Sequence, residues 1–254
     1  MAIKDWFGGG KKKEAYHQKL KEAVSDGKIN ADKAAELEKL RASLDVEDIA
    51  DDKTQLRRAV YNEAAGAVKA TGKITSTEAA ELARVQKFLA LRDDQIDITR
   101  RDLGRLRLLT EIRAGRLPLV PPTSASVRGL TLNQDEVAHY AISAEVLDQL
   151  GGGDDGKNDA CWRIQAAPLP TRALGELPAG GANSFGEGQL IVTNQRLIFR
   201  GAKNTYAFKF GAETEMYLYR DGIRLPKKLG NTLLRAKSPE NLFVAAELIA
   251  RVMR

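Results

Sequence analysis

The spacing of apolar residues divides this chain into two halves. In the first half no proline lies between Lys13 and Arg116, and helix-forming residues dominate, with apolar residues at helical spacing. From Leu130 onward, short runs of β-branched and aromatic residues with strand-like alternation replace that spacing. The pattern predicts an α+β protein with two domains, an all-α bundle followed by an antiparallel β-barrel or sandwich.

The helical half contains a twofold internal repeat with an offset of 45 residues. Asp-Gly-Lys-Ile and Ala-Ala-Glu-Leu within 26–37 correspond to Thr-Gly-Lys-Ile and Ala-Ala-Glu-Leu within 71–82. Each copy also carries apolar residues on one helical face, and burial of these two stripes against each other predicts a bundle of four or five helices. The stripes consist of Leu37, Leu40 and Leu44, and of Leu82, Val85 and Leu89.

Each copy of the repeat predicts a helix, a glycine turn and a second helix. Gly27 and Gly72 suit the left-handed position that ends a helix. The following helices are expected to begin after Asn30 and Thr75. The last helix of the bundle is expected over about 99–114, because a glycine and a proline follow it.

This repeated pattern of Asp-Gly-Lys-Ile and Glu-Leu resembles the helical bundles of TerB-like tellurite-resistance domains over residues 14–97. The resemblance implies a role in bacterial stress or defence and acidic residues that bind metal. Among the acidic positions only Asp26 is present, and its counterpart in the repeat is Thr71. The sequence therefore predicts no metal site here.

Residues 117–127, with the sequence LPLVPPTSASV, predict a linker. Three prolines and a Ser/Thr cluster cannot continue a helix and favour an extended backbone. The expected organisation is a flexible tail at 1–13, a helical bundle at 14–116, the linker, and a β-rich domain at 128–254.

A series of short antiparallel strands is expected in the β-rich domain, because β-branched and aromatic runs alternate there with turn residues. They cover 136–147, 161–165, 189–192, 196–199, 205–210, 217–220, 223–225 and 232–235. Asp221 and Gly222 predict a two-residue turn. A last helix should begin with Ser238 as N-cap, Pro239 at the first helical position and Glu240 in the first turn. Its apolar stripe consists of Leu242, Ala245, Ala246, Ile249 and Val252.

The stretch Gly186–Gly201, GEGQLIVTNQRLIFRG, has the pattern of a β-hairpin with its turn at Thr193-Asn194-Gln195. It resembles the G-x-L-x-x-T-N-x-R-L-x-F-x-G hairpin of bacterial pleckstrin-homology-like (PH-like) and GRAM-like domains. The expected strand order and the C-terminal helix extend the resemblance to residues 128–254. The resemblance implies a small binding module, not an enzyme, in which the helix covers the open end of a curved sheet.

The formal net charge of +6 is unevenly distributed. Residues 128–195 have a net charge of −5, residues 196–237 have a net charge of +7, and residues 98–120 contain six arginines. This asymmetry can steer an anionic partner, or it can reflect two faces that complement each other. The arginines of 98–120 suit contact with nucleic acid, and they equally suit pairing with acidic residues of the bundle.

Several features predict a cytoplasmic location. The N-terminus lacks the apolar core of a signal peptide, and no apolar run reaches the roughly 20 residues that span a membrane. The single cysteine, Cys161, cannot form an internal disulfide and requires no oxidising compartment.

The residue types that carry metal or catalytic chemistry are scarce. His17, His139 and Cys161 are too few for a zinc ligand set. The Asp-Gly-x-Ile repeat lacks the oxygen ligands that a calcium loop needs at its ends. No nucleophile elbow, phosphate loop or dinucleotide motif occurs. The sequence therefore predicts no catalytic residue, no metal and no cofactor.

The N-terminal tail is a candidate membrane contact. One helical turn would place apolar and aromatic side chains together beside a basic tract, as in peripheral proteins on anionic membranes. Alternatively, the tail packs on its own bundle or stays disordered. The residues concerned are Ile3, Trp6, Phe7, Lys11, Lys12 and Lys13.

A basic cluster in the β-rich domain is the second candidate, as a site for an anionic ligand or a partner. Alternatively, it is only a solvated basic face. In PH domains that bind phosphoinositides the basic cluster usually lies in the loop between the first two strands, and here Gly151–Asp159 has three aspartates and one lysine. The members of the candidate cluster are Arg220, Arg224, Lys227, Lys228, Arg235 and Lys237.

Together these features predict a non-catalytic adaptor of bacterial type. One domain would bind a protein partner, and the other, with the tail, an anionic surface at the inner face of the cell membrane. A self-assembling structural protein with head-to-tail contacts between the acidic and basic faces is the alternative. Non-specific binding of nucleic acid ranks third.

Overall fold

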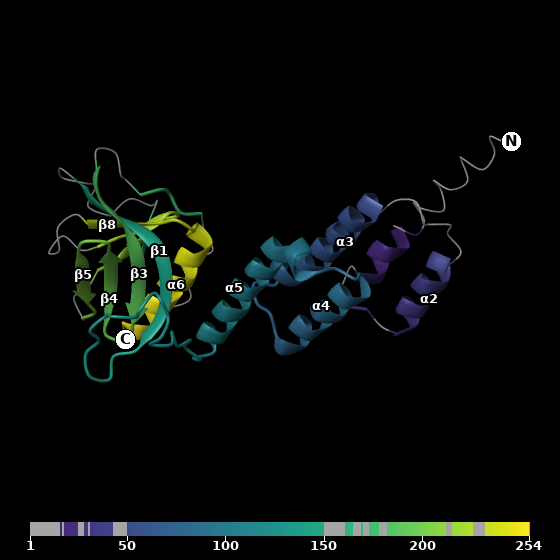
Figure 1. Ribbon diagram of the computed structural model, residues 1–254, viewed down its shortest axis with the longest axis horizontal. Coiled ribbons are helices and arrows are strands. Elements are labelled where there is room, and N and C mark those ends of the chain that lie inside the picture. The colour runs from purple at the N-terminus through teal and green to yellow at the C-terminus, as the bar shows by residue number, and fades with distance from the viewer. Residues whose placement is uncertain are drawn as a thin grey trace. The chain divides into compact units, whose positions relative to one another are not determined.

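The structure is a computed structural model of the 254-residue chain. It describes residues 16, 18–24, 28–29, 31–42, 50–149, 161–164, 169, 173–177, 182–211, 215–225 and 232–253. The chain divides into two compact units, Met1–Thr110 and Glu111–Arg254 (Figure 1).

The first unit is helical, as the apolar spacing predicted. Residues 18–24 form a helix that precedes five further elements. These are α2 (Ala31–Ala42), α3 (Ala50–Ala70), α4 (Ser76–Phe88), the 3-10 helix η1 (Asp93–Ile96) and α5 (Asp97–Arg113). The last three residues of α5 are already counted in the second unit.

Equivalent positions of the internal repeat are buried in the core of the first unit. Leu37 and its counterpart Leu82 are both buried, as are Ala23 and Val68. Val85 and Leu89 complete the second stripe in the same core. Leu40 and Leu44 of the first stripe lie outside the described side chains. The matching burial explains why both copies keep apolar residues at these positions.

Gly72 ends α3 with a left-handed backbone, at a φ of 68°, which confirms the predicted helix end. Its N–H donates to the carbonyl of Lys69 at 3.0 Å. The following helix begins after Thr75, also as predicted, and a capping box with Glu78 fixes its start. The Thr75 N–H donates to the Glu78 carboxylate at 2.7 Å, and this bond holds the pKa of Glu78 below its usual value. Gly27 lies outside the described residues.

Replacing Gly72 tests this helix end. An added Cβ would meet no atom within 4 Å, so the cost is that of a left-handed backbone alone. We expect Gly72→Ala to lower the free energy of unfolding of the first unit by about 1 kcal/mol, and Gly72→Asn to lower it by less. Urea unfolding followed by far-UV circular dichroism measures both. Gly66→Ala, within α3, should instead stabilise the helix, and an equal gain from Gly72→Ala would contradict the assignment.

The second unit contains one antiparallel sheet of eight strands in the order β2-β6-β7-β8-β1-β3-β4-β5. Within the described part of the chain, β2 and β5 at the two ends of this order each pair with one neighbour only. The described sheet is therefore open and does not close into a barrel, so the barrel form of the predicted barrel or sandwich is wrong. The strands are β1 (Ala138–Gln149), β2 (Trp162–Arg163), β3 (Ala182–Thr193), β4 (Arg196–Gly201), β5 (Thr205–Lys209), β6 (Tyr217–Leu218), β7 (Gly222–Arg224) and β8 (Thr232–Ala236).

The helix α6 (Pro239–Val252) packs against β1, β3 and β8 (Figure 1). Its predicted start is confirmed: the Ser238 hydroxyl accepts a hydrogen bond from the N–H of Asn241, and Pro239 occupies the first helical position. Four of its five predicted stripe residues are fully buried, namely Leu242, Ala245, Ala246 and Ile249.

The turn between β6 and β7 lies one residue earlier than predicted. Leu218 pairs with Ile223, and the Tyr219 N–H donates to the Gly222 carbonyl at 2.8 Å. The two turn residues are therefore Arg220 and Asp221. Gly222 is required for space, since a Cβ there would lie 2.1 Å from Leu177 Cδ1 and 2.4 Å from a β8 carbonyl oxygen.

Residues 117–132, named the arm below, run irregularly across one face of this sheet. The predicted linker forms most of the arm, and its apolar side chains share a cluster with Ile191 of β3 and Ile198 of β4. The Val120 N–H donates to the Ala138 carbonyl at 2.8 Å. His139 is buried and its Nδ1 lies 2.7 Å from the Pro118 carbonyl oxygen. The arm is thus part of the second unit's packing.

Candidate functional site

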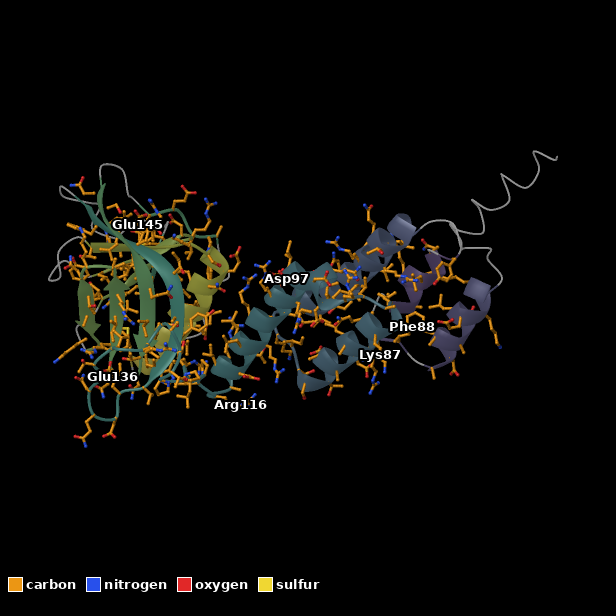
Figure 2. All side chains as sticks on the ribbon, in the orientation of Figure 1. Lys87, Phe88, Asp97, Arg116, Glu136 and Glu145 are labelled. Carbon is orange, nitrogen blue, oxygen red and sulfur yellow. The ribbon has the colours of Figure 1, made fainter. Side chains whose placement is uncertain are left out.

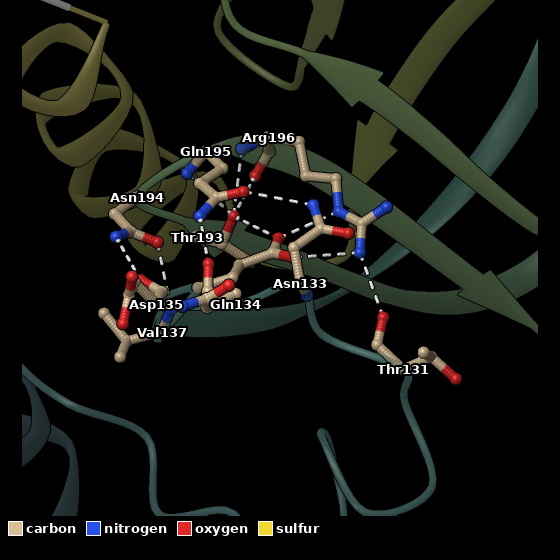
Figure 3. A network of polar contacts seen from close by, with 10 residues as sticks. Thr131, Asn133, Gln134, Asp135, Val137, Thr193, Asn194, Gln195 and Arg196 are labelled. Carbon is tan, nitrogen blue, oxygen red and sulfur yellow. Dashed lines mark hydrogen bonds and ion pairs between the residues drawn. The ribbon is translucent and has the colours of Figure 1, made fainter.

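A buried ion pair lies beneath the turn of the β3–β4 hairpin (Figure 3). The side chain of Glu136 is fully buried, and that of Arg196 is 16% exposed. The Arg196 guanidinium donates to both oxygens of Glu136, from Nε at 2.8 Å and from Nη2 at 2.9 Å. The same Nη2 donates to the Thr131 carbonyl of the arm at 3.0 Å. This bidentate geometry is the strong form of a charge-assisted pair.

The two residues that give the hairpin motif its Thr-Asn signature complete this network. The Thr193 hydroxyl donates to Glu136 at 2.8 Å and accepts the Arg196 N–H at 2.9 Å. Asn194 uses its Oδ1 to accept the Val137 N–H and its Nδ2 to donate to the Asp135 carbonyl, both at 2.9 Å. Figure 3 shows these bonds joining the hairpin turn to the segment before β1. The polar residues of the motif therefore have a structural role, because they link the hairpin turn to the segment before β1.

The ionisation of Glu136 reflects this environment. Burial, the largest influence, raises its pKa. Hydrogen bonds from the Arg196 guanidinium, the Asn133 N–H and the Thr193 hydroxyl lower it, as does the Arg196 charge. The lowering effects together prevail, so the pKa of Glu136 lies below its usual value of 4.5.

A hollow lined by aromatic residues lies elsewhere on the same sheet, where β3, β4 and β5 meet. It encloses about 250 Å³. Phe185 at its rim is 57% exposed, one of the large apolar side chains that the described surface presents to solvent. The residues that line this β3–β5 hollow are Phe185, Gly186, Glu187, Phe199, Gly201, Ala202, Lys203, Asn204 and Tyr206.

Two glycines help to form the β3–β5 hollow. Gly188 of β3 pairs with Gly201 of β4, so neither strand contributes a side chain at that position. A Cβ on Gly188 would lie 2.2 Å from the Arg200 carbonyl oxygen and 2.8 Å from the Phe199 ring. Phe199 pairs with Tyr206 across the strands, and their ring centroids are 6.4 Å apart. The result is a concave surface with aromatic rings in its lining, on which an apolar side chain can pack.

The four described members of the predicted basic cluster are not among the residues that line this hollow, although Lys237 pairs with one of them, Glu187. Each of the four has an interaction partner within its own unit. Arg220 forms an ion pair with Glu176. Arg224 is buried, with its guanidinium 4.9 Å from the centroid of the Tyr217 ring. The other two pair with carboxylates, Arg235 with Asp221 at 3.4 Å and Lys237 with Glu187. Lys227 and Lys228 lie outside the described residues.

Three of the six arginines within 98–120 pair with carboxylates close by in sequence. Arg100 pairs with Asp93, Arg101 with Asp97 and Arg105 with Asp102. In the second unit Arg113 lies 3.7 Å from the buried carboxylate of Glu247. These contacts favour the second of the two sequence interpretations, pairing within the protein.

The candidate membrane residues Ile3, Trp6, Phe7, Lys11, Lys12 and Lys13 lie outside the described residues. In the parts of the chain that are described, no helix has both the length and the apolar character needed to cross a membrane. Those same parts contain no group of three or more His, Cys, Asp or Glu residues that could hold a metal ion.

Comparisons with protein-family models, with curated proteins and with solved structures found no match.

Sequence reasoning missed Glu136 and the β3–β5 hollow. Figure 2 labels Glu136 and Glu145, which lie toward opposite ends of the second unit's sheet. One signal for the hollow was present. Gly186 and Gly188 lie within β3 and Gly201 ends β4, at positions where strands normally carry side chains. No comparable signal marked Glu136, because its partner lies 60 residues away in the sequence.

Proposed function

We propose that this chain is a non-catalytic adaptor whose second unit is a PH-like, GRAM-like module. The strands β1, β3, β4 and β5 are neighbours in its sheet in that order. Three more strands follow in the chain as β6, β7 and β8, and then the helix α6. This succession, with β2 as an additional strand, supports the PH-like assignment. In the same proposal residues 14–116 are a TerB-like bundle and residues 128–254 the PH-like domain.

The observation that supports the adaptor function most strongly is the aromatic-lined β3–β5 hollow, which lies beside β5 at one edge of the sheet. Its Phe185 is largely exposed although it is aromatic, and exposed aromatic side chains beside concave surfaces are typical of protein-binding sites. We therefore assign a protein partner to this module. A cytoplasmic location, contact of the tail with an anionic membrane and a role in stress or defence complete the proposal.

The test is partner capture with a matched control variant. The full chain, tagged and cross-linked in its native cell, should recover the same partner in repeated experiments. The variant Phe185→Ser should recover at least about tenfold less of it, whereas Ile98→Ser, at an exposed apolar residue of the first unit, should recover as much as the wild type. Recovery of no specific partner, or equal recovery with both variants, would count against the adaptor site.

A further inference from the structure

The outer side of β5 presents backbone groups that the described sheet does not use. The Gly201 N–H donates to the Asn204 carbonyl, and the Phe210 N–H donates to the Gln195 carbonyl. Hydrogen-bonded pairs alternate along an antiparallel ladder. Tyr206 and Phe208 therefore direct their N–H and C=O groups toward β4. Thr205, Ala207 and Lys209 direct theirs away from the sheet, where no described strand pairs with β5.

The side chains of β5 also alternate. Tyr206 shares one face with Phe199 and belongs to the β3–β5 hollow. Thr205, Ala207 and Lys209 share the opposite face and are exposed. A chain added beside β5 would place every second residue next to the hollow and the residues between them next to Lys209.

The segment that forms this edge carries charge of one sign. Residues 196–211, which form β4, β5 and their connection, contain two arginines, two lysines and no acidic residue. Arg196 and Arg200 donate to the arm, to the carbonyls of Thr131 and Arg128. Lys203 and Lys209 are exposed at the two ends of β5. An added strand thus lies between two cations.

We propose that β5 binds an extended acidic peptide of a partner protein by strand addition, with the peptide's apolar side chains beside the β3–β5 hollow. The peptide alternates acidic and apolar residues, because its two faces meet Lys209 and Tyr206 respectively. This inference rests on the proposed adaptor function and specifies the partner's chemistry. Main-chain hydrogen bonds supply affinity in such complexes, and alternate side chains supply specificity.

A second copy of this chain fits the same edge poorly. Antiparallel pairing of β5 with the β5 of a second copy would place Lys203 and Lys209 of both copies along one interface. Lysines on edge strands are a common device that prevents such self-pairing. An acidic peptide instead brings carboxylates to this lysine-bearing edge, so the charge favours a peptide over a copy.

The test uses the full chain and a fluorescent peptide of repeating Glu-Val-Asp-Phe, with fluorescence anisotropy as the readout. The variant Ala207→Pro removes one outward N–H and no hydrogen bond within the sheet, a position at which edge strands tolerate proline. Ala207→Val keeps the N–H and is the matched control. A peptide with lysine in place of each acid controls for charge. A peptide N-methylated at alternate residues tests the ladder on the wild-type chain, should Ala207→Pro fail to fold.

The acidic peptide should bind the wild type and Ala207→Val alike. Binding should weaken at least about tenfold for Ala207→Pro, for the lysine peptide and for N-methylation in the pairing register. Absence of binding, or equal binding to Ala207→Pro and to both N-methylated registers, would overturn strand addition. Self-association that Ala207→Pro abolishes, without peptide binding, would identify a second copy as the occupant. A partner still captured by Ala207→Pro in the native cell would refute this site alone and leave the adaptor function standing.

Discussion

Replacing Glu136 by alanine should lower the free energy of unfolding of the second unit by about 3–5 kcal/mol. The substitution leaves the Arg196 guanidinium inside the protein without its bidentate partner. It also removes the acceptor for the Thr193 hydroxyl and the Asn133 N–H, and unmade buried hydrogen bonds are costly. Denaturant unfolding followed by tryptophan fluorescence measures the loss, in a Trp6→Phe background that leaves Trp162 as the one tryptophan.

A matched control separates the effect of burying an ion pair from the effect of forming one. Glu176 also pairs with an arginine, Arg220, but its side chain is 66% exposed. Glu176→Ala should therefore cost less than about 1 kcal/mol. Comparable losses for Glu136→Ala and Glu176→Ala would show that the buried pair has no special role. A double-mutant cycle of Glu136 with Arg196 gives the coupling between them.

The same carboxylate should make stability depend on pH. Its pKa in the folded protein lies below the usual 4.5, so the unfolded chain takes up this proton first as the pH falls. The contribution of Glu136 is complete above the unfolded value, and it is lost as the pH falls below about 4.5 through the lower folded pKa. Between pH 6 and pH 3 the wild type should lose more stability than Glu136→Gln, and parallel curves would refute the assignment.

The second large effect is expected for Gly188→Ala. The added Cβ would lie 2.2 Å from the Arg200 carbonyl oxygen and 2.8 Å from its carbon. Both atoms belong to the backbone of β4, which cannot move without breaking the β3–β4 ladder. We expect a loss of about 3 kcal/mol or more, at the upper end of the cost of overpacking. Thermal unfolding of the second unit measures it.

Gly104→Ala is the contrasting glycine substitution. An added Cβ at Gly104 in α5 meets no atom within 4 Å, and alanine favours helix by about 0.5–1 kcal/mol over glycine. Gly104→Ala should therefore slightly raise the free energy of unfolding of the first unit. If Gly188→Ala changed the free energy of unfolding by no more than Gly104→Ala does, the β3–β4 pair would accommodate the added Cβ, and the prediction would be wrong.

Local signals made much of the fold predictable. The left-handed Gly72, the helix start after Thr75 and the cap at Ser238 each depend on residues within one turn of one another. The β3–β4 hairpin likewise follows from its own sixteen residues, 186–201. Such features need no knowledge of distant segments, which is why sequence reasoning placed them correctly.

Long-range features were not predictable in the same way. A proline-rich segment predicts an irregular backbone, but its packing on β3 and β4 depends on Ile191 and Ile198, far along the chain. The Thr-Asn-x-Arg motif predicted a turn and gave no sign of its buried acceptor, Glu136. The Asp-Gly pair predicted a turn at the wrong residue. Gly222 is needed because a side chain there would collide with Leu177, a distant residue, and not because the turn requires glycine.

The arm has a consequence for how the second unit is made on the ribosome. Arg200 donates to the carbonyl of Arg128, 72 residues earlier in the chain. At typical rates of synthesis, roughly 4–14 seconds pass between the appearance of these two residues. Over that interval the apolar residues of the arm are exposed without the strands that later cover them. Nascent chains that end before β4 should therefore attract chaperones, and release should follow once β4 has emerged.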